Sequence, residues 1–316
     1  MPQVRRKTPK TELISPQVVE KPEAMEEAPK PPGTTVLVVS YNRVDLLRKA
    51  VEALERSKDR EKIEILVVDN GSTDGSAQLE TDFPTTRFIR MPRNFGLTKA
   101  LNVALRSATG EFILLLHEDT EVSPETVSLL TGILENQGDV GAACPLLVTP
   151  DGQPGPQISS LPAPGRTSLE WRPADPALGE QTVEYARGAA IMVRSLSLRA
   201  MGKIDERYGT YGSDAEICFQ VRRAGKRVLL TPSTRVIHHG RADLDARSRA
   251  TIDADRILGM AVYLRKRFGI VRGLLYHISV ILGALGGLLT LRDFSYRFSL
   301  FGALLSGQKI DGTQAQ

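Results

Sequence analysis

The sequence contains little cysteine and few aromatic residues. Only two of its 316 residues are cysteine, Cys144 and Cys218, and aromatic residues make up 5%. Two distant thiols cannot form a disulfide framework, and the sequence has no CxxC pair of the kind that holds structural zinc. A reduced, cytoplasmic setting is the expectation for such a chain.

Two common phosphate-binding motifs are also missing. No GxGxxG follows the first expected strand, and no GxxxxGKS loop occurs in the chain. A dinucleotide-binding Rossmann site or a P-loop is therefore not expected. A bound diphosphate would need another source of positive charge, such as a divalent metal.

The net charge is small, at +4 from 41 Lys/Arg and 37 Asp/Glu, and does not indicate nucleic-acid binding. It is unevenly distributed, because residues 34–264 carry a net −2 whereas residues 265–316 carry +5. The positive excess therefore lies beside the apolar C-terminal segment, where anionic lipid headgroups would attract it.

The first 33 residues predict a disordered tail. They contain seven of the 19 prolines, mix basic residues with Glu, and have no periodic apolar face. No apolar stretch of the kind found in secretory signals follows the basic start, so we do not interpret this segment as one.

From Thr34 the chain alternates buried β-type runs with helical patterns. Strands are expected at 35–39, 63–68, 87–90 and 112–116, and helices at 44–56 and 97–107. This alternation is typical of βαβ units in a mostly parallel sheet flanked by helices. Residues 149–182 lack periodicity and predict a long loop. Further on, we expect a strand at 183–193, a helix at 214–224 and short strands at 226–230 and 234–237.

The C-terminal segment is apolar. Residues 273–291 are 19 residues without a formal charge, and a second apolar patch covers 298–305. A run of this length can span a membrane. It can also attach to the membrane as an interfacial or re-entrant segment, or pack on the preceding domain or a partner subunit. We divide the chain into a tail at 1–33, an α/β domain at 34–264 and a basic, apolar helical extension at 265–316.

Polar side chains follow the ends of the expected strands. Ligands in open α/β sheets bind at the carboxyl ends of strands, and Asp119 stands at one such end. Carboxylates are the ligands that Mg²⁺ or Mn²⁺ prefers. An imidazole from His238 or His239, after the last expected strand, would complete such a site.

Seven motifs follow one another along the α/β region: Thr34–Arg43, Val67–Ser76, Arg93–Gly96, Leu115–Thr120, Gly188–Val193, Ile204–Glu206 and Tyr211–Glu216. In this order they resemble the motifs of family-two glycosyltransferases of GT-A fold, and within that family the bacterial rhamnosyltransferase-like branch. The resemblance covers about residues 34–241.

The resemblance implies transfer of a sugar from a nucleoside-diphosphate donor with inversion at the anomeric carbon. It implies that Asp214 is the catalytic base and that Asp119 and His238 hold the metal. The positions matching nucleotide-sugar contacts are Ser40, Asp69, Asn70, Arg93, Asn94, Gly96 and Glu118. Acceptor or sugar-side candidates are Gly188, Asp205, Glu206 and Trp171.

Three positions depart from the family pattern. The DxD equivalent is His117-Glu118-Asp119, where His117 either coordinates or only hydrogen-bonds. Ser213 precedes the base where many relatives have Glu, and Asn70 replaces a frequent aspartate. The metal carboxylate and the base both remain.

We therefore expect an inverting transferase that moves a hexose or deoxyhexose, with rhamnose a candidate, to a glycan or lipid-linked glycan in cell-envelope polysaccharide synthesis. Its location would be the cytoplasmic face of the membrane. The alternative is a catalytically silent GT-A domain that binds nucleotide-sugar or glycan. Nucleotidyl transfer would require a Gly-rich phosphate loop, which is absent after the first expected strand.

Overall fold

A computed structural model of the chain describes residues 33–167, 169–240, 245–289 and 293–307. The chain divides into two units, Met1–Pro31 and Pro32–Gln316, and every described residue belongs to the second. Except for Gly33, the predicted tail lies outside the described residues.

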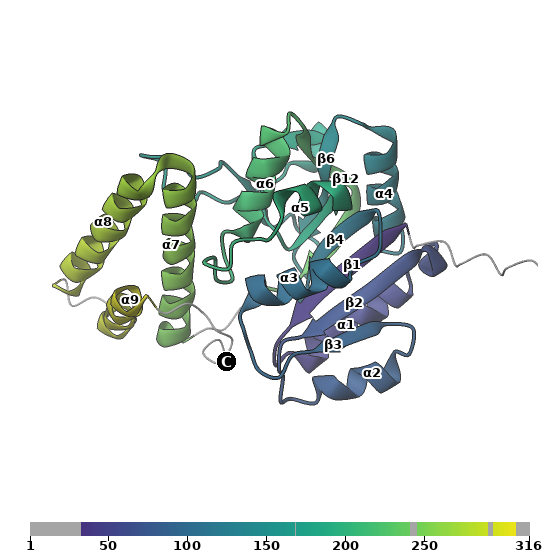
Figure 1. Ribbon diagram of the computed structural model, residues 1–316, viewed down its shortest axis with the longest axis horizontal. Coiled ribbons are helices and arrows are strands. Elements are labelled where there is room, and N and C mark those ends of the chain that lie inside the picture. The colour runs from purple at the N-terminus through teal and green to yellow at the C-terminus, as the bar shows by residue number, and fades with distance from the viewer. Residues whose placement is uncertain (1–32, 168, 241–244, 290–292, 308–316) are drawn as a thin grey trace, which may run out of the picture. The chain divides into compact units, whose positions relative to one another are not determined.

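The main sheet is mixed but mostly parallel around its N-terminal half (Figure 1). Its strand order is β3-β2-β1-β4-β11-β6-β12-β5, with β9 paired to β12. The pairs β1–β2, β1–β4, β2–β3 and β6–β12 are parallel, whereas β11 and β5 run antiparallel to their neighbours. The strands are β1 (Thr34–Ser40), β2 (Ile63–Asp69), β3 (Arg87–Arg90), β4 (Phe112–His117), β5 (Thr120–Val122), β6 (Val140–Val148), β9 (Gln181–Val183), β11 (Ala190–Arg194) and β12 (Arg227–His238).

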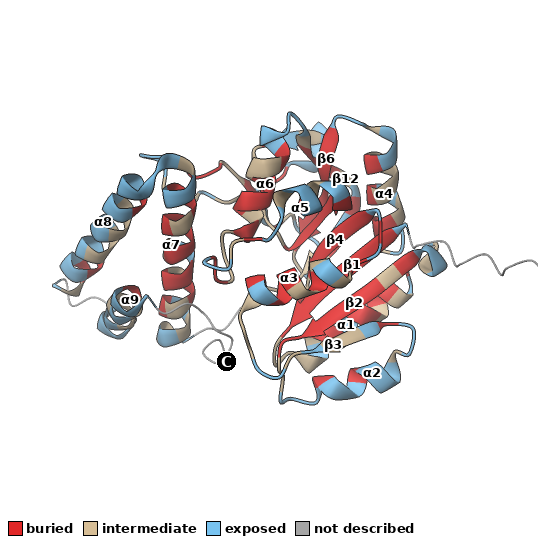
Figure 2. Ribbon diagram, viewed as in Figure 1, coloured by how far each residue is buried: buried red, intermediate tan, exposed pale blue. Residues whose placement is uncertain are grey.

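Helices cover both faces of this sheet, which explains the continuous apolar runs. All seven residues of β1 are buried, and alternate side chains enter two different cores because successive side chains of a strand point to opposite faces. Leu37 and Val39 join one core, whereas Val36 and Val38 join the other. The strands appear as a buried block in Figure 2.

The expected helices are present to within one residue at each end. They are α1 (Val44–Glu55), α3 (Leu97–Ser107) and α6 (Ser213–Arg223). Before residue 241, three other α-helices were not expected from the sequence: α2 (Leu79–Asp82), α4 (Thr126–Asn136) and α5 (Ser195–Met201). Helices α1 and α4 contribute to one core, and α3 and α6 to the other.

Three expectations about the middle of the chain were wrong. Residues 149–182 are not a structureless loop, because β7 (Pro156–Ser159) and β8 (Arg172–Pro173) form a small sheet with β10 (Tyr185–Ala186). The strand expected over 183–193 is divided among β9, β10 and β11. Conversely, the two short strands expected from residue 226 to 237 are one strand, β12, with a register shift between Thr231 and Arg235. Pro232 stands in that irregularity, where a residue without an N–H is tolerated.

The C-terminal region consists of α7 (Ala246–Phe268), α8 (Ile270–Leu288) and α9 (Phe294–Ser306) (Figure 1). Helix α7 runs without a break across residue 264, where the sequence suggested a domain boundary. Asp245 begins α7, as its carboxylate accepts a hydrogen bond of 2.6 Å from the Ser248 N–H. A small apolar cluster containing Ala254, Leu258, Ala284 and Leu304 joins the three helices.

Candidate active site

A cavity of about 570 Å³ lies at the carboxyl ends of β1 and β4. Its remaining walls come from the start of α6, from residues near β10 and from one face of α7. Ten of the fourteen predicted site residues line it: Ser40, Asn70, Asn94, Gly96, Glu118, Asp119, Trp171, Gly188, Asp214 and His238. The other four, Asp69, Arg93, Asp205 and Glu206, lie outside its lining.

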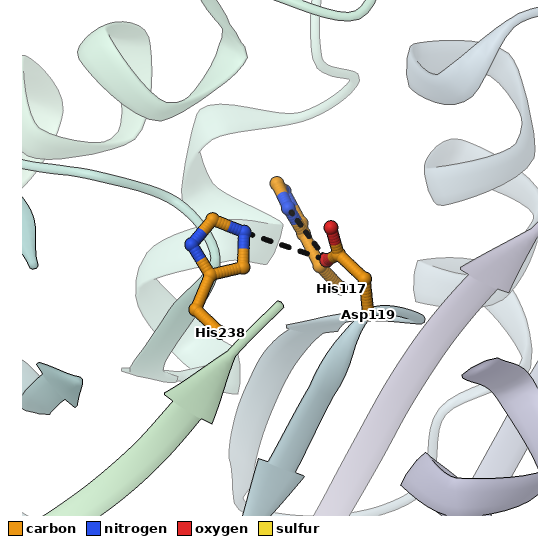
Figure 3. Close-up of side chains that lie close together, drawn as sticks. All are labelled: His117, Asp119 and His238. Carbon is orange, nitrogen blue, oxygen red and sulfur yellow. Dashed lines mark ion pairs between the residues drawn. The ribbon is translucent and has the colours of Figure 1, made fainter. Parts of the chain in front are cut away.

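Three potential metal ligands converge at one end of this cavity (Figure 3). His238 Nε2 lies 3.4 Å from Asp119 Oδ1, and His117 Nδ1 lies 3.9 Å from the same oxygen. One ligand atom from each residue falls within a set no more than 4.8 Å across. Two imidazoles and one carboxylate form a donor set that suits a divalent transition metal.

The Asp119 carboxylate fits this role. Its Oδ1 atom is buried and has no hydrogen-bond partner among the described residues. Burial opposes the charge, but His238, the charge of His117 and Arg43 together hold the pKa of Asp119 below its usual range. Burial lowers the pKa of His117, which favours the neutral imidazole with a nitrogen lone pair that can coordinate.

Strand pairing determines which of the two adjacent histidines joins the cluster. Strand β12 runs antiparallel to β5, with His238 opposite Thr120. This pairing brings His238 next to Asp119. His239 points elsewhere, and its Nε2 lies 2.6 Å from Glu121 Oε1. His239 is therefore engaged outside the cluster.

The Asp214 carboxylate faces the same cavity from the first turn of α6. The Tyr185 hydroxyl donates to Asp214 Oδ1 at 2.7 Å, and the Gly188 N–H donates to Oδ2 at 3.2 Å. Burial, followed by the Asp214 charge, raises the pKa of Tyr185, so its phenol keeps its proton and remains a donor. The Ala215 N–H also donates to Oδ1, at 2.9 Å. Since a carboxylate has about four acceptor positions, Asp214 can accept one further hydrogen bond.

Two glycines make this geometry sterically feasible. A Cβ at Gly188 would lie 2.8 Å from the Asp214 Cβ. Gly212, just before α6, has φ +104°, and a Cβ there would lie 2.7 Å from the Tyr208 ring. Larger residues at these positions would displace either the carboxylate or the turn that carries it.

Amide side chains organise the part of the cavity that Asn70 and Asn94 line. Asn70 Nδ2 donates to Asn94 Oδ1 at 3.0 Å, and Asn70 Oδ1 accepts from the Phe95 N–H at 3.0 Å. Asn94 Oδ1 also accepts from the Gly96 N–H at 2.8 Å. The Ser40 hydroxyl, by contrast, is buried without a hydrogen-bond partner among the described residues. This part of the cavity therefore offers an oriented polar surface and a hydroxyl available to a ligand.

Predicted residues outside the lining have structural contacts. Asp69 Oδ1 accepts from the Ser72 N–H at 3.0 Å. Asp205 pairs with Arg207 at 2.7 Å, and this contact lowers the pKa of Asp205 to about 2. Glu206 pairs with Lys203 at 2.6 Å, and the Arg93 guanidinium lies 4.4 Å from the centre of the Phe95 ring. These four side chains shape loops around the cavity.

A buried carboxylate on α7 holds the loop that precedes Asp214. Asp255 is fully buried, and its Oδ2 accepts from the N–H groups of Thr210 at 2.8 Å and Tyr211 at 3.2 Å. A Cβ at Gly209 would lie 1.8 Å from Asp255 Oδ1. Helix α7 therefore supports the site as well as lining it.

Four residues of the site were not predicted from the sequence: Tyr185, Arg187, Asp255 and Arg256. A signal for the first two was their position directly before the Gly188–Val193 motif. A signal for Asp255 was its acidic side chain among the apolar residues Ala250, Ala254 and Leu258. Arg256 had no comparable signal, because an Arg on a charged helix is ordinarily solvent-exposed.

Comparison with known families gives a match over much of the catalytic region. The profile named "Glycosyl transferase family 2" matches residues 35–196. An N-acetylglucosaminyl-diphospho-decaprenol L-rhamnosyltransferase of Mycobacterium tuberculosis is 24% identical over 233 residues, which cover 65% of this chain and 75% of that protein. The O-antigen biosynthesis protein RfbC of Myxococcus xanthus is 29% identical over 250 residues, covering 73% of this chain but only 19% of that protein.

Solved structures share the fold. The mannosyltransferase PcManGT from Pyrobaculum calidifontis, determined with GDP-Man and Mn²⁺, has a TM-score of 0.55 and 17% identity. The similarity covers 88% of each chain. GalNAc-T7, determined with UDP, GalNAc and Mn²⁺, has a TM-score of 0.56 and 17% identity, covering 68% of this chain and 45% of that one. The expected GT-A fold is confirmed.

Proposed function

The chain belongs to glycosyl transferase family 2, and from this premise we propose that it transfers a hexose or deoxyhexose, with inversion, from a nucleoside-diphosphate sugar to a glycan or lipid-linked glycan. The observation that carries this proposal is that the Asp119 cluster and the Asp214 carboxylate face one cavity. A transfer reaction needs a charge-stabilising group beside the leaving diphosphate and a base beside the attacking hydroxyl.

Asp214 acts as the base. It takes the proton of an acceptor hydroxyl while that oxygen forms a bond to the anomeric carbon, and the bond to the diphosphate oxygen breaks with its electron pair leaving on the nucleoside diphosphate. Tyr185 and Gly188 orient the carboxylate through their hydrogen bonds. Single displacement gives inversion and requires no protein nucleophile.

Asp119, His238 and His117 would hold the divalent ion. A bound Mg²⁺ or Mn²⁺ would offset charge on the donor diphosphate. The unsatisfied Oδ1 atom of Asp119 supports this assignment, as does the Mn²⁺ named for PcManGT and GalNAc-T7.

The nucleoside binds in the part of the cavity lined by Ser40, Asn70, Asn94 and Gly96. The Ser40 hydroxyl offers a hydrogen bond to the ligand, and Asn70 and Asn94 fix the surrounding loop. Glu118, which precedes the metal carboxylate, lines the same cavity. Asp69 and Arg93 support this part from outside the lining, and Asp205 and Glu206 similarly support the acceptor side.

The acceptor is a lipid-linked glycan in cell-envelope polysaccharide synthesis. Support comes from the M. tuberculosis relative, whose name specifies an N-acetylglucosaminyl-diphospho-decaprenol acceptor. Rhamnose is the first donor sugar to test, for the same reason. Gly188 and Trp171 lie on the Asp214 side of the cavity, where this acceptor would enter.

The protein acts at the cytoplasmic face of a membrane. Helix α8 is long and apolar enough to cross a bilayer, with a mean hydropathy of 1.5. Because 17% of that apolar window is buried within the protein, most of it is available to lipid. Residues 265–316 also carry a net charge of +5, which favours an anionic surface.

The test is release of nucleoside diphosphate by purified full-length protein, with a panel of nucleotide sugars, lipid-linked acceptors, and Mg²⁺ or Mn²⁺. We expect turnover to stop in EDTA and to fall by about 100-fold or more in Asp119→Asn, given the size of such electrostatic contributions. Asp151→Asn, at an exposed turn, is the matched control. Full turnover in EDTA would exclude the metal assignment.

The alternative is a silent GT-A domain that binds nucleotide-sugar or glycan. Such a protein would bind the donor in the presence of metal, yet no acceptor in the panel would produce turnover. The presence of both Asp119 and Asp214 in one cavity favours the enzyme.

A further inference from the structure

Two arginines lie on the Asp214 side of the cavity without a strong acidic partner. Arg187 comes from the turn between β10 and β11, and Arg256 from α7; both line the cavity. The Arg187 guanidinium makes no hydrogen bond or ion pair with any described side chain. Among the described residues Arg256 has one ion pair, with the half-exposed Asp253 at 3.3 Å.

Aromatic rings fix both guanidinium groups near the catalytic base. The Arg187 guanidinium lies 5.0 Å from the centre of the Trp171 ring, and Trp171 contacts Tyr185 with a centroid distance of 4.8 Å. Tyr185 in turn donates to Asp214. The Arg256 guanidinium lies 4.6 Å from the centre of the ring of Tyr211, which precedes Asp214 by three residues.

Two positive charges in one partly closed cavity raise the free energy of the folded protein unless an anion lies between them. Burial first, and the Arg256 charge second, lower the pKa of Arg187. Asp214 and Tyr211 oppose this effect without reversing it. Arg249, also from α7, adds a third cation to the lining. Planar guanidinium groups match phosphate oxygens well, because they donate two parallel hydrogen bonds.

The Asp119 cluster already serves the donor diphosphate in the function proposed above, and the arginine pair is additional to it. We propose that Arg187 and Arg256 form a second anion subsite that binds a phosphate of the acceptor lipid. This inference rests on the proposed function and deepens it, because it specifies a lipid phosphate or diphosphate as the acceptor carrier.

The apolar surface next to this subsite supports an amphiphilic ligand. On α7, Ile252, Gly259 and Met260 line the same cavity as Arg256. Beyond Gly269, α8 exposes a series of large apolar side chains, including Ile270, Leu274 and Leu275. A phosphate at the arginine pair would therefore lie in a cavity whose α7 wall is apolar and suits the first part of a prenyl chain.

Trp171 provides a direct measurement, since it is the only tryptophan in the chain and lies against Arg187. Full-length protein in EDTA is titrated with farnesyl diphosphate, inorganic pyrophosphate and farnesol while Trp171 fluorescence is recorded. Both diphosphates should give a saturable change, and farnesol should not. Arg187→Gln and Arg256→Gln should each raise the Kd of farnesyl diphosphate about tenfold or more, the loss expected for a charge-assisted hydrogen bond. Arg247→Gln, at an exposed position of α7, should leave it unchanged.

A competition experiment distinguishes the acceptor from the donor as the source of the phosphate. With Mn²⁺ and saturating nucleoside diphosphate, the Kd for farnesyl diphosphate should remain unchanged. Competition between the two ligands, or an unchanged Kd in both arginine variants, would overturn the proposal. Failure of the donor screen together with intact farnesyl diphosphate binding would refute the proposed transfer and leave this subsite standing.

Discussion

The α/β region and the C-terminal helices are both rich in apolar residues, but they differ in where these side chains lie. In β6 all nine residues are buried, whereas α8 buries only Gly273, Ala284 and Gly287 of its nineteen. Of the fifteen exposed large apolar side chains in the described part of the chain, twelve lie between Phe268 and Leu305. Figure 2 shows this contrast.

This difference indicates that the two regions have different roles. The sheet buries its apolar faces under helices and places polar groups at the strand ends, which gives a rigid site for chemistry. The C-terminal helices leave most of their large apolar side chains exposed, a feature that binding surfaces share. Helix α7 belongs to both, because it lines the cavity with Arg256 and packs against α8 and α9.

The largest expected effect is a loss of turnover that leaves the C-terminal helices unaffected, and it follows from a change at Asp214. Asp214→Asn keeps the shape of the side chain but removes its ability to accept a proton. We expect kcat to fall by about 10²–10⁴-fold, the usual contribution of general base catalysis. Donor binding and sedimentation with lipid vesicles should remain at wild-type levels. Wild-type turnover in this variant would refute the role of Asp214 as base.

A change in α7, the helix that belongs to both regions, should lower both the stability of the protein and its kcat. Asp255→Ala leaves two backbone N–H groups, of Thr210 and Tyr211, without their acceptor. We expect the free energy of unfolding to fall by about 2–4 kcal/mol, and kcat to fall because the loop before Asp214 loses its support. Chemical denaturation and steady-state kinetics measure the two effects. The matched control is Arg247→Ala, and equal stability of the two variants would contradict the supporting role of Asp255.

A change confined to α8 should weaken membrane binding and leave catalysis unchanged. Leu275→Lys combined with Leu282→Lys places two charges on side chains that are 59% and 61% exposed. We expect partition into vesicles of phosphatidylglycerol and phosphatidylcholine to fall by about tenfold or more, as buried apolar area is lost. Turnover of a water-soluble acceptor should not change. Leu178→Lys combined with Leu196→Lys, at exposed sites of the α/β region, is the control. Unchanged partition would argue against membrane attachment through α8.

The smallest expected effect concerns an ion cluster between α6 and α7. Burial disfavours the Glu216 carboxylate, but hydrogen bonds from Gln220 and Arg267 and the charge of Lys266 hold its pKa below the usual 4.5. A carboxylate with a lowered folded-state pKa contributes stability above its unfolded-state value and loses it as the pH falls. We therefore expect wild-type stability to decline more steeply below about pH 4.5 than that of Glu216→Gln. Glu135→Gln, on the exposed face of α4, should follow the wild type, and thermal unfolding across this range measures the difference.

Much of the α/β region could be predicted because its signals are local. The run Thr35–Val39 reads as a strand buried on both faces, and Leu47, Val51 and Leu54 recur at helical spacing. The small sheet of β7, β8 and β10 could not be found in this way. Its strands are two to four residues long, and Arg172 pairs with Ile158 across a long connection. Such short segments have too few residues to establish a period.

The sequence by itself determined the alternation of strands and helices and the polar residues at strand ends, and it led to the prediction that Asp119 is a metal ligand and Asp214 the base. These follow from periodicity and from motifs that are continuous in the chain. Only the tertiary structure decided that His238 rather than His239 meets Asp119, because successive side chains of a strand point to opposite sides and the β5–β12 pairing determines which side faces the cavity. Packing likewise brought Arg256 toward Arg187 and Asp255 beneath the loop before Asp214. Those contacts join residues far apart in the chain, so no local pattern records them.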